Sequence, residues 1–193
     1  TAYRRQRQMC IRDRTQLRAR FMRINHGRLQ RAMQALSSRQ QRVLTLLPLL
    51  FHVNHPLLPG YVSAQTPAGL AGFEPGAELL AEAQRLTRSF AYKPPRAPAP
   101  TPIHGLFLMG SLGTLAQAEQ SDMDLWVCHA SELDSDARDA LRRKCDLLQS
   151  WAASQGAEAH FFLIDPERFR SGARDAQLTS DDCGTTQLSL IHI

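Results

Sequence analysis

The sequence predicts an α+β fold in which helices precede a small sheet that carries one further helix. Three short apolar segments, at residues 103–110, 122–128 and 158–165, have the length and composition of buried strands. An amphipathic segment at residues 131–156 separates the last two, and helical periodicity dominates the chain before residue 92. Helices and strands that follow one another in separate blocks are typical of α+β domains.

The first block, residues 15–92, is predicted to be a helical segment. Apolar residues of its first helix share roughly one face. They are Leu17, Phe21, Ile24, Leu29, Met33 and Leu36. Ser37 or Ser38 can cap a second helix, which the two prolines and the glycine of NHPLLPGYV end. The apolar residues of that second helix are Val43, Leu46, Leu47 and Leu50. A third, short helix is expected at residues 75–90.

A proline-rich connector, KPPRAPAPTP at residues 93–102, is the clearest boundary in the chain and is expected to be stiff and extended. The second block, residues 103–187, is predicted to form the functional core. Asp134 or Ser135 can cap its amphipathic helix, and Gly156 stands where a left-handed residue would end it. The apolar face of this helix comprises Leu133, Ala137, Leu141, Cys145, Leu148 and Ala152. The basic run Arg142–Lys144 is assigned to its solvated face.

The two ends of the chain are predicted not to be native protein. The C-terminal LSLIHI, residues 188–193, back-translates to DNA whose reverse complement encodes Met9–Asp13 and opens the codon of Arg14. An inverted repeat that flanks a reading frame resembles the transposon end used in sequencing-library preparation. Residues 1–14 and 188–193 are therefore interpreted as adapter translation and left out of the fold argument. The alternative is a basic arm for nucleic acid.

This exclusion changes the charge of the chain. The formal net charge of +5 loses five arginines and one aspartate within residues 1–14, which leaves +1. A nearly neutral chain gives no support for a nucleic-acid or membrane partner. No apolar run approaches the roughly 20 residues that a membrane-spanning helix needs.

Cysteine usage indicates the compartment. Outside the two ends, Cys128, Cys145 and Cys183 are widely spaced and form no C-x-x-C pair. They fit neither a disulfide framework nor a zinc site, so a reducing cytoplasm is the expected location.

Asp122 and Asp124 enter the second apolar segment one residue apart. In a strand they share a face, with Cα atoms about 6–7 Å apart, while Met123 and Leu125 face a core. Two carboxylates on one face repel each other unless a cation lies between them, and Mg²⁺ is typically held by one or two carboxylates together with substrate phosphates. The pair therefore predicts a divalent-cation site, although Asp-x-Asp alone is more often a solvated strand edge.

Gly110 and Ser111 end the first apolar segment. Gly110 has no side chain to block close backbone approach, Gly113 keeps the turn small, and Ser111 adds a hydroxyl. If a helix begins just after Ser111, its exposed N–H groups would favour phosphate oxygens. A nucleoside triphosphate could therefore lie between this turn and a metal-loaded strand.

The combined pattern of strand, Gly-Ser, ten residues, Asp-x-Asp and apolar continuation resembles the signature of the polymerase-β-like nucleotidyltransferase superfamily. SDMDLWVCH, RRKCDLLQSWAASQG, HFFLIDPERFR, DDCGTTQ and the upstream LLPLLFHVNHPLLPGYV also resemble the N-terminal catalytic domain of class I adenylate cyclases of gammaproteobacteria. This resemblance runs from about Ile24 to Gln187. It implies a nucleotidyltransferase core with a small mixed sheet, truncated before its end and preceded by the helical segment.

The resemblance implies conversion of ATP to 3′,5′-cyclic AMP and pyrophosphate. Gly110 and Ser111 would hold the triphosphate, and Asp122 and Asp124 would bind two Mg²⁺ ions, with Mn²⁺ as the alternative. One ion would activate the ribose 3′-hydroxyl, and the other would stabilise charge on the triphosphate. The implied partners are ATP, a C-terminal regulatory region of the same protein and a component of the sugar phosphotransferase system.

Such enzymes usually bring a third carboxylate from a following strand. Glu158 is the candidate for this catalytic and metal-binding role, because it opens the third apolar segment and shares strand parity with His160 and Phe162. Asp165 lies at the end of the segment on the opposite parity and is the weaker choice.

Other conspicuous residues receive structural interpretations. His52 and His55 have no third ligand nearby and suit a polar role at a helix end better than metal binding. Trp126 and Trp151 are expected to pack in the core. Residues 181–183 match the family pattern without an assigned role.

Two alternative functions remain open. One is another nucleotidyltransferase, which moves a nucleotide onto a protein or a small molecule. The other is a non-catalytic nucleotide-binding module on the same fold. Asp122 and Asp124 argue against the second alternative, because a decayed site usually loses its metal ligands first.

Overall fold

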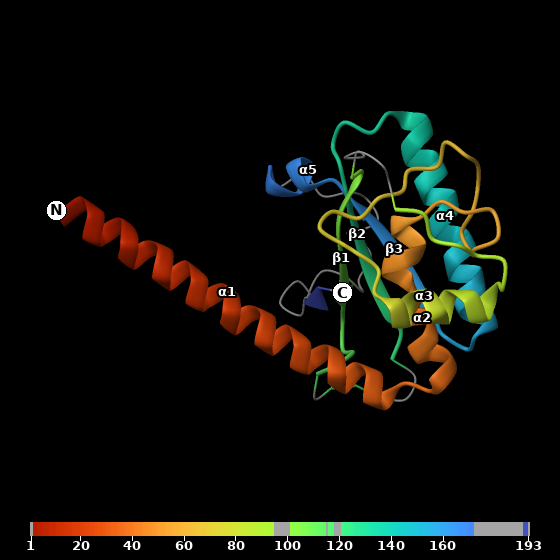
Figure 1. The fold of residues 1–193 in the computed structure, drawn as a ribbon, viewed down its shortest axis with the longest axis horizontal. Helices are drawn as coiled ribbons and strands as arrows, with labels where there is room; N and C mark the ends of the chain where they lie inside the picture. Colours follow the sequence, from red (N-terminus) through yellow and green to blue (C-terminus); the bar gives the residue numbers. More distant parts are fainter. Residues whose placement is uncertain (1, 95–100, 115, 118–120, 172–190, 193) are drawn as a thin grey trace.

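The computed structural model describes residues 2–94, 101–114, 116–117, 121–171 and 191–192, with the backbone alone for 2–12 and 191–192. The elements are α1 Ala2–Ala35, α2 Ser38–His52, α3 Ala77–Leu86, β1 Ile103–Met109, β2 Met123–His129, α4 Ser135–Ser154, β3 Ala159–Ile164, α5 Pro166–Arg170 and β4 Ile191–His192. Three helices precede the main strands, which confirms the predicted α+β class (Figure 1).

The sheet has the strand order β3-β2-β1-β4. β1 runs antiparallel to β2 and to the two-residue β4, whereas β2 and β3 are parallel. A parallel pair needs a crossover connection, and α4 provides it between the end of β2 and the start of β3. The sheet is therefore small and mixed, as expected.

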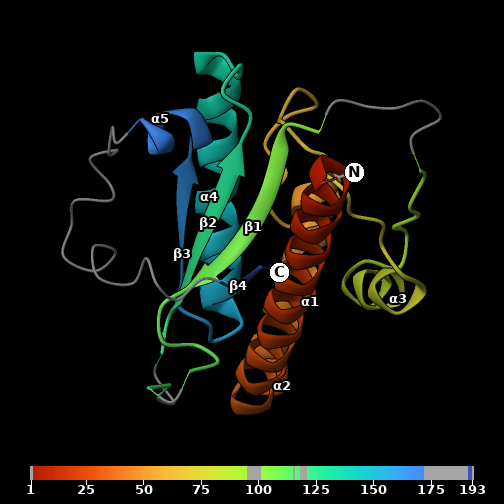
Figure 2. The ribbon, with the colours of Figure 1, turned by 90° about the vertical axis from the view of Figure 1, so that its left-hand side faces the viewer.

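The two faces of the sheet pack against different partners. Met123 and Leu125 of β2 belong to the main apolar core, together with residues of α2 and α4. The alternate residue Trp126 belongs to a smaller cluster with Met109 and Ile164. Figure 2 shows α4 behind the strands and α5 beside the end of β3. The face that carries Trp126 is also the face on which the sequence places Asp124.

α1 is longer than the predicted helix and passes through Gly27 without a break. Its C-terminal end packs on the domain, where Ala32 is buried. Leu17, Phe21 and Ile24 are exposed, and Figure 1 shows the N-terminal part of α1 extending away from the sheet. The N-terminal part of the predicted apolar face is therefore exposed, because it projects beyond the core.

Ser37 is the N-cap of α2, which settles the choice between Ser37 and Ser38. Its hydroxyl accepts from the Gln40 N–H at 3.4 Å, and the Gln40 side-chain oxygen accepts from the Ser37 N–H at 2.9 Å. This reciprocal capping box satisfies two backbone donors at the helix start. The helix accommodates Pro48 and ends at His52, just before the predicted breaker segment.

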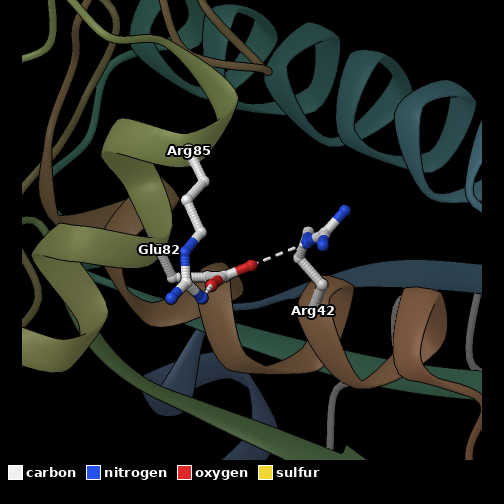
Figure 3. A network of polar contacts seen from close by, with 3 residues as sticks. All are labelled: Arg42, Glu82 and Arg85. Carbon is white, nitrogen blue, oxygen red and sulfur yellow. Dashed lines mark hydrogen bonds and ion pairs between the residues drawn. The ribbon is translucent and has the colours of Figure 1, made fainter.

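An acidic residue, Glu82, ties α3 to α2. Arg42 Nε donates to Glu82 Oε1 at 2.7 Å, and Arg85 of the same helix pairs with Oε2 (Figure 3). The hydrogen bond from Arg42 is the larger cause that lowers the pKa of Glu82, and Arg85 adds to it. α3 is shorter than the predicted helix at residues 75–90, because it already ends at its C-cap Thr87.

The predicted caps of α4 are confirmed. Asp134 Oδ1 accepts from the Ala137 N–H at 2.8 Å at the helix start. Gly156, just past the helix end, has a φ of 74°, which is the left-handed conformation that favours glycine.

The solvated assignment of Arg142–Lys144 is wrong for Lys144, which is 1% exposed. In the helix this residue lies three positions after Leu141 and four before Leu148, both of which face the core. Gly60 packs over its side chain, so that a Cβ on Gly60 would be 3.3 Å from Lys144 Cγ. Burial lowers the pKa of the Lys144 amine to about 8.

The predicted connector, residues 93–102, falls partly outside the described residues, which omit 95–100. The main core combines side chains from both sides of it, for example Leu47 and Leu106. The proposed domain boundaries and the adapter interpretation of residues 1–14 and 188–193 stay predictions. Among the described residues, no helix has both the length and the apolarity needed to cross a bilayer.

Candidate functional site

The Gly-Ser pair forms a tight turn at the end of β1. Gly110 has a φ of 82° and Gly113 a φ of 70°, both in the left-handed region that glycine adopts at little cost. The Thr114 N–H donates to the Ser111 carbonyl at 3.0 Å and closes the turn. Residues 110–114 are a turn and not a helix start, so the conditional expectation of helix N–H groups at Ser111 is wrong.

The structure brings this turn against Asp124. Met109 is the cross-strand partner of Asp124, so Gly110 lies beside it. A Cβ on Gly110 would be 3.4 Å from Asp124 Oδ2. Asp124 is 8% exposed and is the only buried Asp or Glu in the described part of the chain. The predicted neighbourhood of Gly110 and Asp124 is therefore present.

Asp122 lies just before β2 and differs from Asp124 in exposure. Its side chain is 49% exposed. The preceding Ser121 has its hydroxyl oxygen 2.8 Å from that of Ser111, which links the Gly-Ser turn to the entry of β2. Ser111 and Asp122 are thus held at the same end of the sheet, where a ligand can reach both.

His160 lies between the carboxylates of Asp122 and Glu158, which precede two neighbouring strands. It is the parallel partner of Asp124 in the β2–β3 register. Its Nε2 is 3.4 Å from Glu158 Oε1 and 4.0 Å from Asp122 Oδ2. Glu158 is 73% exposed and precedes β3, where its carbonyl accepts from the Met123 N–H at 2.8 Å. The strand parity that His160 shares with Glu158 had already indicated that the two side chains lie on one face.

Asp165, the weaker candidate for the third carboxylate, lies at the other end of β3. Five residues separate it from His160, or about 16 Å along a strand. Its Oδ1 accepts from the Ser131 hydroxyl at 2.7 Å and from the Glu167 N–H at 2.9 Å. These bonds, with Ser131 first, lower the pKa of Asp165, which acts as the N-cap of α5.

The donor set at the Gly-Ser end suits a hard divalent cation. Asp122 and Asp124 offer carboxylate oxygens, which Mg²⁺ prefers, and it usually keeps several waters and takes substrate phosphates as further ligands. Within the described residues no three His, Cys, Asp or Glu side chains are grouped as a metal site. The residues therefore fit a cation that a bound triphosphate helps to hold, and Glu158 as third ligand stays a prediction.

The remaining candidates have structural roles. His52 Nδ1 accepts from the Leu70 N–H at 3.2 Å, and its Nε2 lies 3.2 Å from the Tyr92 hydroxyl. Burial is the main cause that lowers the pKa of His52. His55 Nδ1 accepts from the Leu57 N–H at 3.2 Å. These contacts confirm the polar role at the helix end.

The two tryptophans pack as expected. Trp126 is buried in the smaller cluster with its ring 5.5 Å from that of Phe169, and Trp151 packs against the main core. Burial also raises the pKa of the nearby Cys128 thiol to about 11, so this thiol is protonated at neutral pH and is no thiolate nucleophile. Residues 181–183 lie outside the described residues.

Comparison with known proteins shows the family to which the chain belongs. A family model described as the adenylate cyclase NT domain matches residues 13–192. The adenylate cyclases of Escherichia coli O6:H1 and Escherichia coli K12 are each 42% identical to the chain over 178 residues, and that of Yersinia pestis is 41% identical over 179. Each match covers 91% of this chain, which spans 21% of the relative's length. No solved structure matches the chain.

Proposed function

The chain belongs to the adenylate cyclase NT domain family, and from this premise we propose that it carries part of an active site that converts ATP to 3′,5′-cyclic AMP and pyrophosphate. The observation that carries the proposal is the contact between Gly110 and Asp124. The proposed fold is that of the polymerase-β-like nucleotidyltransferases. The mixed sheet and the Gly-Ser turn beside Asp122 and Asp124 support it.

Each residue of the turn has a distinct task. Gly110 leaves the backbone open on the side of Asp124, where a phosphate oxygen and its cation need room. The Ser111 hydroxyl, 2.8 Å from the Ser121 hydroxyl, is held at the entry of β2 and can donate to a phosphate oxygen. The Ser121 hydroxyl can donate to the Ser111 oxygen, which leaves the single hydroxyl hydrogen of Ser111 for the phosphate.

The two aspartates differ in exposure, and we assign them different roles. Asp124 is buried, so its charge acts in a lower effective dielectric and attracts a cation more strongly than a solvated carboxylate would. Asp122 is exposed and faces the ligand side, where it can share the cation with substrate oxygens. When bound, two Mg²⁺ or Mn²⁺ ions would activate the ribose 3′-hydroxyl and neutralise charge on the leaving pyrophosphate.

Glu158 completes the proposed metal and catalytic set. It lies at the same end of the sheet as Asp122, since His160 contacts both carboxylates. The imidazole between them can hold the two side chains in place until a cation replaces the contact.

The proposal extends to partners and location through the family. The match spans 21% of the length of the adenylate cyclase of Escherichia coli O6:H1, which supports a further regulatory region in the same protein. Control by a component of the sugar phosphotransferase system is proposed on the same ground. A cytoplasmic location is supported by the free thiols of Cys128 and Cys145.

Product analysis tests the function. The protein, expressed from its complete reading frame, is incubated with labelled ATP and Mg²⁺ without an acceptor, and the products are separated. We expect cyclic AMP and pyrophosphate, with a loss of about 100-fold or more in Asp124→Asn. Asp139→Asn, an exposed carboxylate of α4, is the control and should retain activity. A nucleotide attached to an acceptor would indicate another nucleotidyltransferase, and binding without turnover a non-catalytic module.

A further inference from the structure

Arg31 of α1 lies beside the Gly-Ser turn. Arg31 Nε donates to the Gly113 carbonyl at 3.2 Å, across 82 positions of the sequence. Gly113 is two residues past Ser111 in the turn that the Thr114 N–H closes. Two residues span about 7 Å at most, so the Arg31 guanidinium lies within about 10 Å of the Ser111 backbone.

The Gly113 contact uses only one donor of the Arg31 guanidinium. Nη1 lies 3.8 Å from the position of a Cβ on Gly27, so the group occupies the space between α1 and the turn. Among the described residues, no carboxylate lies within 4.0 Å of Arg31. A guanidinium held by one carbonyl, with donors remaining, is suited to bind a phosphate in a forked geometry.

Arg28 brings a second positive charge to the same side of α1. It lies three residues before Arg31, and side chains at this spacing are neighbours on a helix. Arg28 is partly buried, and burial, followed by the charge of Arg31, lowers its pKa. An anion bound close to both guanidinium groups would be attracted by the two positive charges.

We propose that Arg31 and Arg28 bind the outer phosphates of the nucleotide, so that α1 forms one wall of the site. The inference rests on the proposed function, because it needs a triphosphate at Gly110 and Ser111. Arg31 also acts as a positioning residue, since its Nε holds the Gly113 carbonyl and thereby the turn. We expect this wall to raise the affinity for di- and triphosphates relative to monophosphates.

The test measures binding of Mg²⁺–ATP, Mg²⁺–pyrophosphate and AMP to the chain by calorimetry. In Arg31→Ala we expect ATP and pyrophosphate to bind about 10- to 100-fold more weakly, because charge-assisted hydrogen bonds to phosphate are lost. AMP should change by less than about twofold, since it lacks the outer phosphates. Arg31→Lys keeps the charge without the fork and should recover part of the loss. Arg23→Ala, an exposed arginine of the same helix, is the matched control.

A second variant separates phosphate binding from positioning. Arg28→Ala leaves the contact between Arg31 and Gly113 in place, and we expect it to weaken pyrophosphate binding about fivefold or more. Equal losses for AMP and ATP in Arg31→Ala would show a merely structural role and overturn the inference.

The outcomes also separate this inference from the proposed function. If Asp124→Asn weakens Mg²⁺-dependent ATP binding while Arg31→Ala and Arg28→Ala bind like the wild type, the inference fails and the proposed function stands. A wild-type chain that binds neither ATP nor pyrophosphate overturns both.

Discussion

The carboxylate of Asp124 lies against the backbone of Gly110, so that a Cβ at this glycine would be 3.4 Å from Asp124 Oδ2. The two residues meet because β1 and β2 pair with Met109 opposite Asp124. This contact joins the two halves of the motif, the Gly-Ser turn and the acidic strand. The φ of 82° at Gly110 explains why the position between strand and turn is a glycine.

Gly110→Ala tests this relationship. Its φ of 82° costs an alanine about 1–2 kcal/mol, which should appear as a lower free energy of unfolding in urea. The added methyl would also lie in van der Waals contact with Asp124 Oδ2, in the space proposed for a phosphate oxygen and its cation, so we expect Mg²⁺-dependent ATP binding to weaken about tenfold or more.

Gly72→Ala is the matched control for Gly110→Ala. Its φ of 66° carries a similar backbone cost, but a Cβ there would meet nothing within 4 Å. It should lose stability and keep nucleotide binding. If Gly110→Ala binds nucleotide as well as Gly72→Ala does, the contact has no part in the site.

Substitutions at the two candidates for the third carboxylate are expected to have opposite effects on turnover and on stability. Glu158→Gln should lower kcat about tenfold or more without a measurable change in unfolding, because the side chain is 73% exposed and its ion-pair partner in the described part of the chain is His160. Asp165→Ala should reduce stability by about 1 kcal/mol through loss of the cap of α5 and leave kcat intact. Turnover and urea unfolding of both variants check this. Unchanged turnover in Glu158→Gln would remove that residue from the site.

The buried charge of Lys144 is predicted to lower the free energy of unfolding at neutral pH. The folded protein holds a charged amine in a buried place, so Lys144→Met should raise the free energy of unfolding by about 1–3 kcal/mol at pH 7. The folded-state pKa of about 8 is below the ordinary 10.5, so between these values the unfolded chain binds more protons. The wild type should therefore gain stability relative to Lys144→Met as the pH rises from about 8 to 10.5.

The control for this variant is Arg143→Met, an exposed neighbour on α4, for which we expect a change within about 0.5 kcal/mol at either pH. Urea unfolding at pH 7 and pH 10 provides the comparison. A destabilised Lys144→Met at pH 7 would show that the amine has a compensating partner, and the prediction would be wrong.

Glu82 should contribute to the free energy of unfolding through its charge. Glu82→Gln weakens the pairing with Arg42 and Arg85 and is expected to cost about 0.5–1 kcal/mol at pH 7, because both arginines are partly solvated. The folded state lowers the pKa of Glu82, so its contribution is present above the ordinary pKa of 4.5 and is lost as the pH falls through the folded value. Glu74→Gln, an exposed acid before α3, is the control. A difference between Glu82→Gln and the wild type that persists at pH 2.5 would contradict the electrostatic explanation.

Local signals predicted the elements well. The capping box at Ser37, the cap at Asp134 and the left-handed Gly156 each depend on a few neighbouring residues, and the structure confirms them. Strand parity correctly assigned Met123 to the core face, because alternation along a strand needs no knowledge of the partner strands.

The differences arise where one pattern masks another or where a contact depends on a distant segment. Lys144 belongs to a basic run, yet its helical position and the packing of Gly60 bury it. Leu17 continues an apolar face past the end of the core that would cover it. The contact of Arg31 with Gly113 joins residues 82 positions apart, and no local pattern marks it.

The most direct test of the central claim is calorimetric titration of ATP into the wild-type chain and into Asp124→Asn, each with Mg²⁺ and with excess chelator. We expect wild-type binding to require the cation, and Asp124→Asn to bind at least about tenfold more weakly in Mg²⁺ and to lose most of the difference between the two conditions. If Asp124→Asn binds ATP as tightly as the wild type, with the same dependence on Mg²⁺, the buried carboxylate beside Gly110 does not hold the metal and the account is wrong.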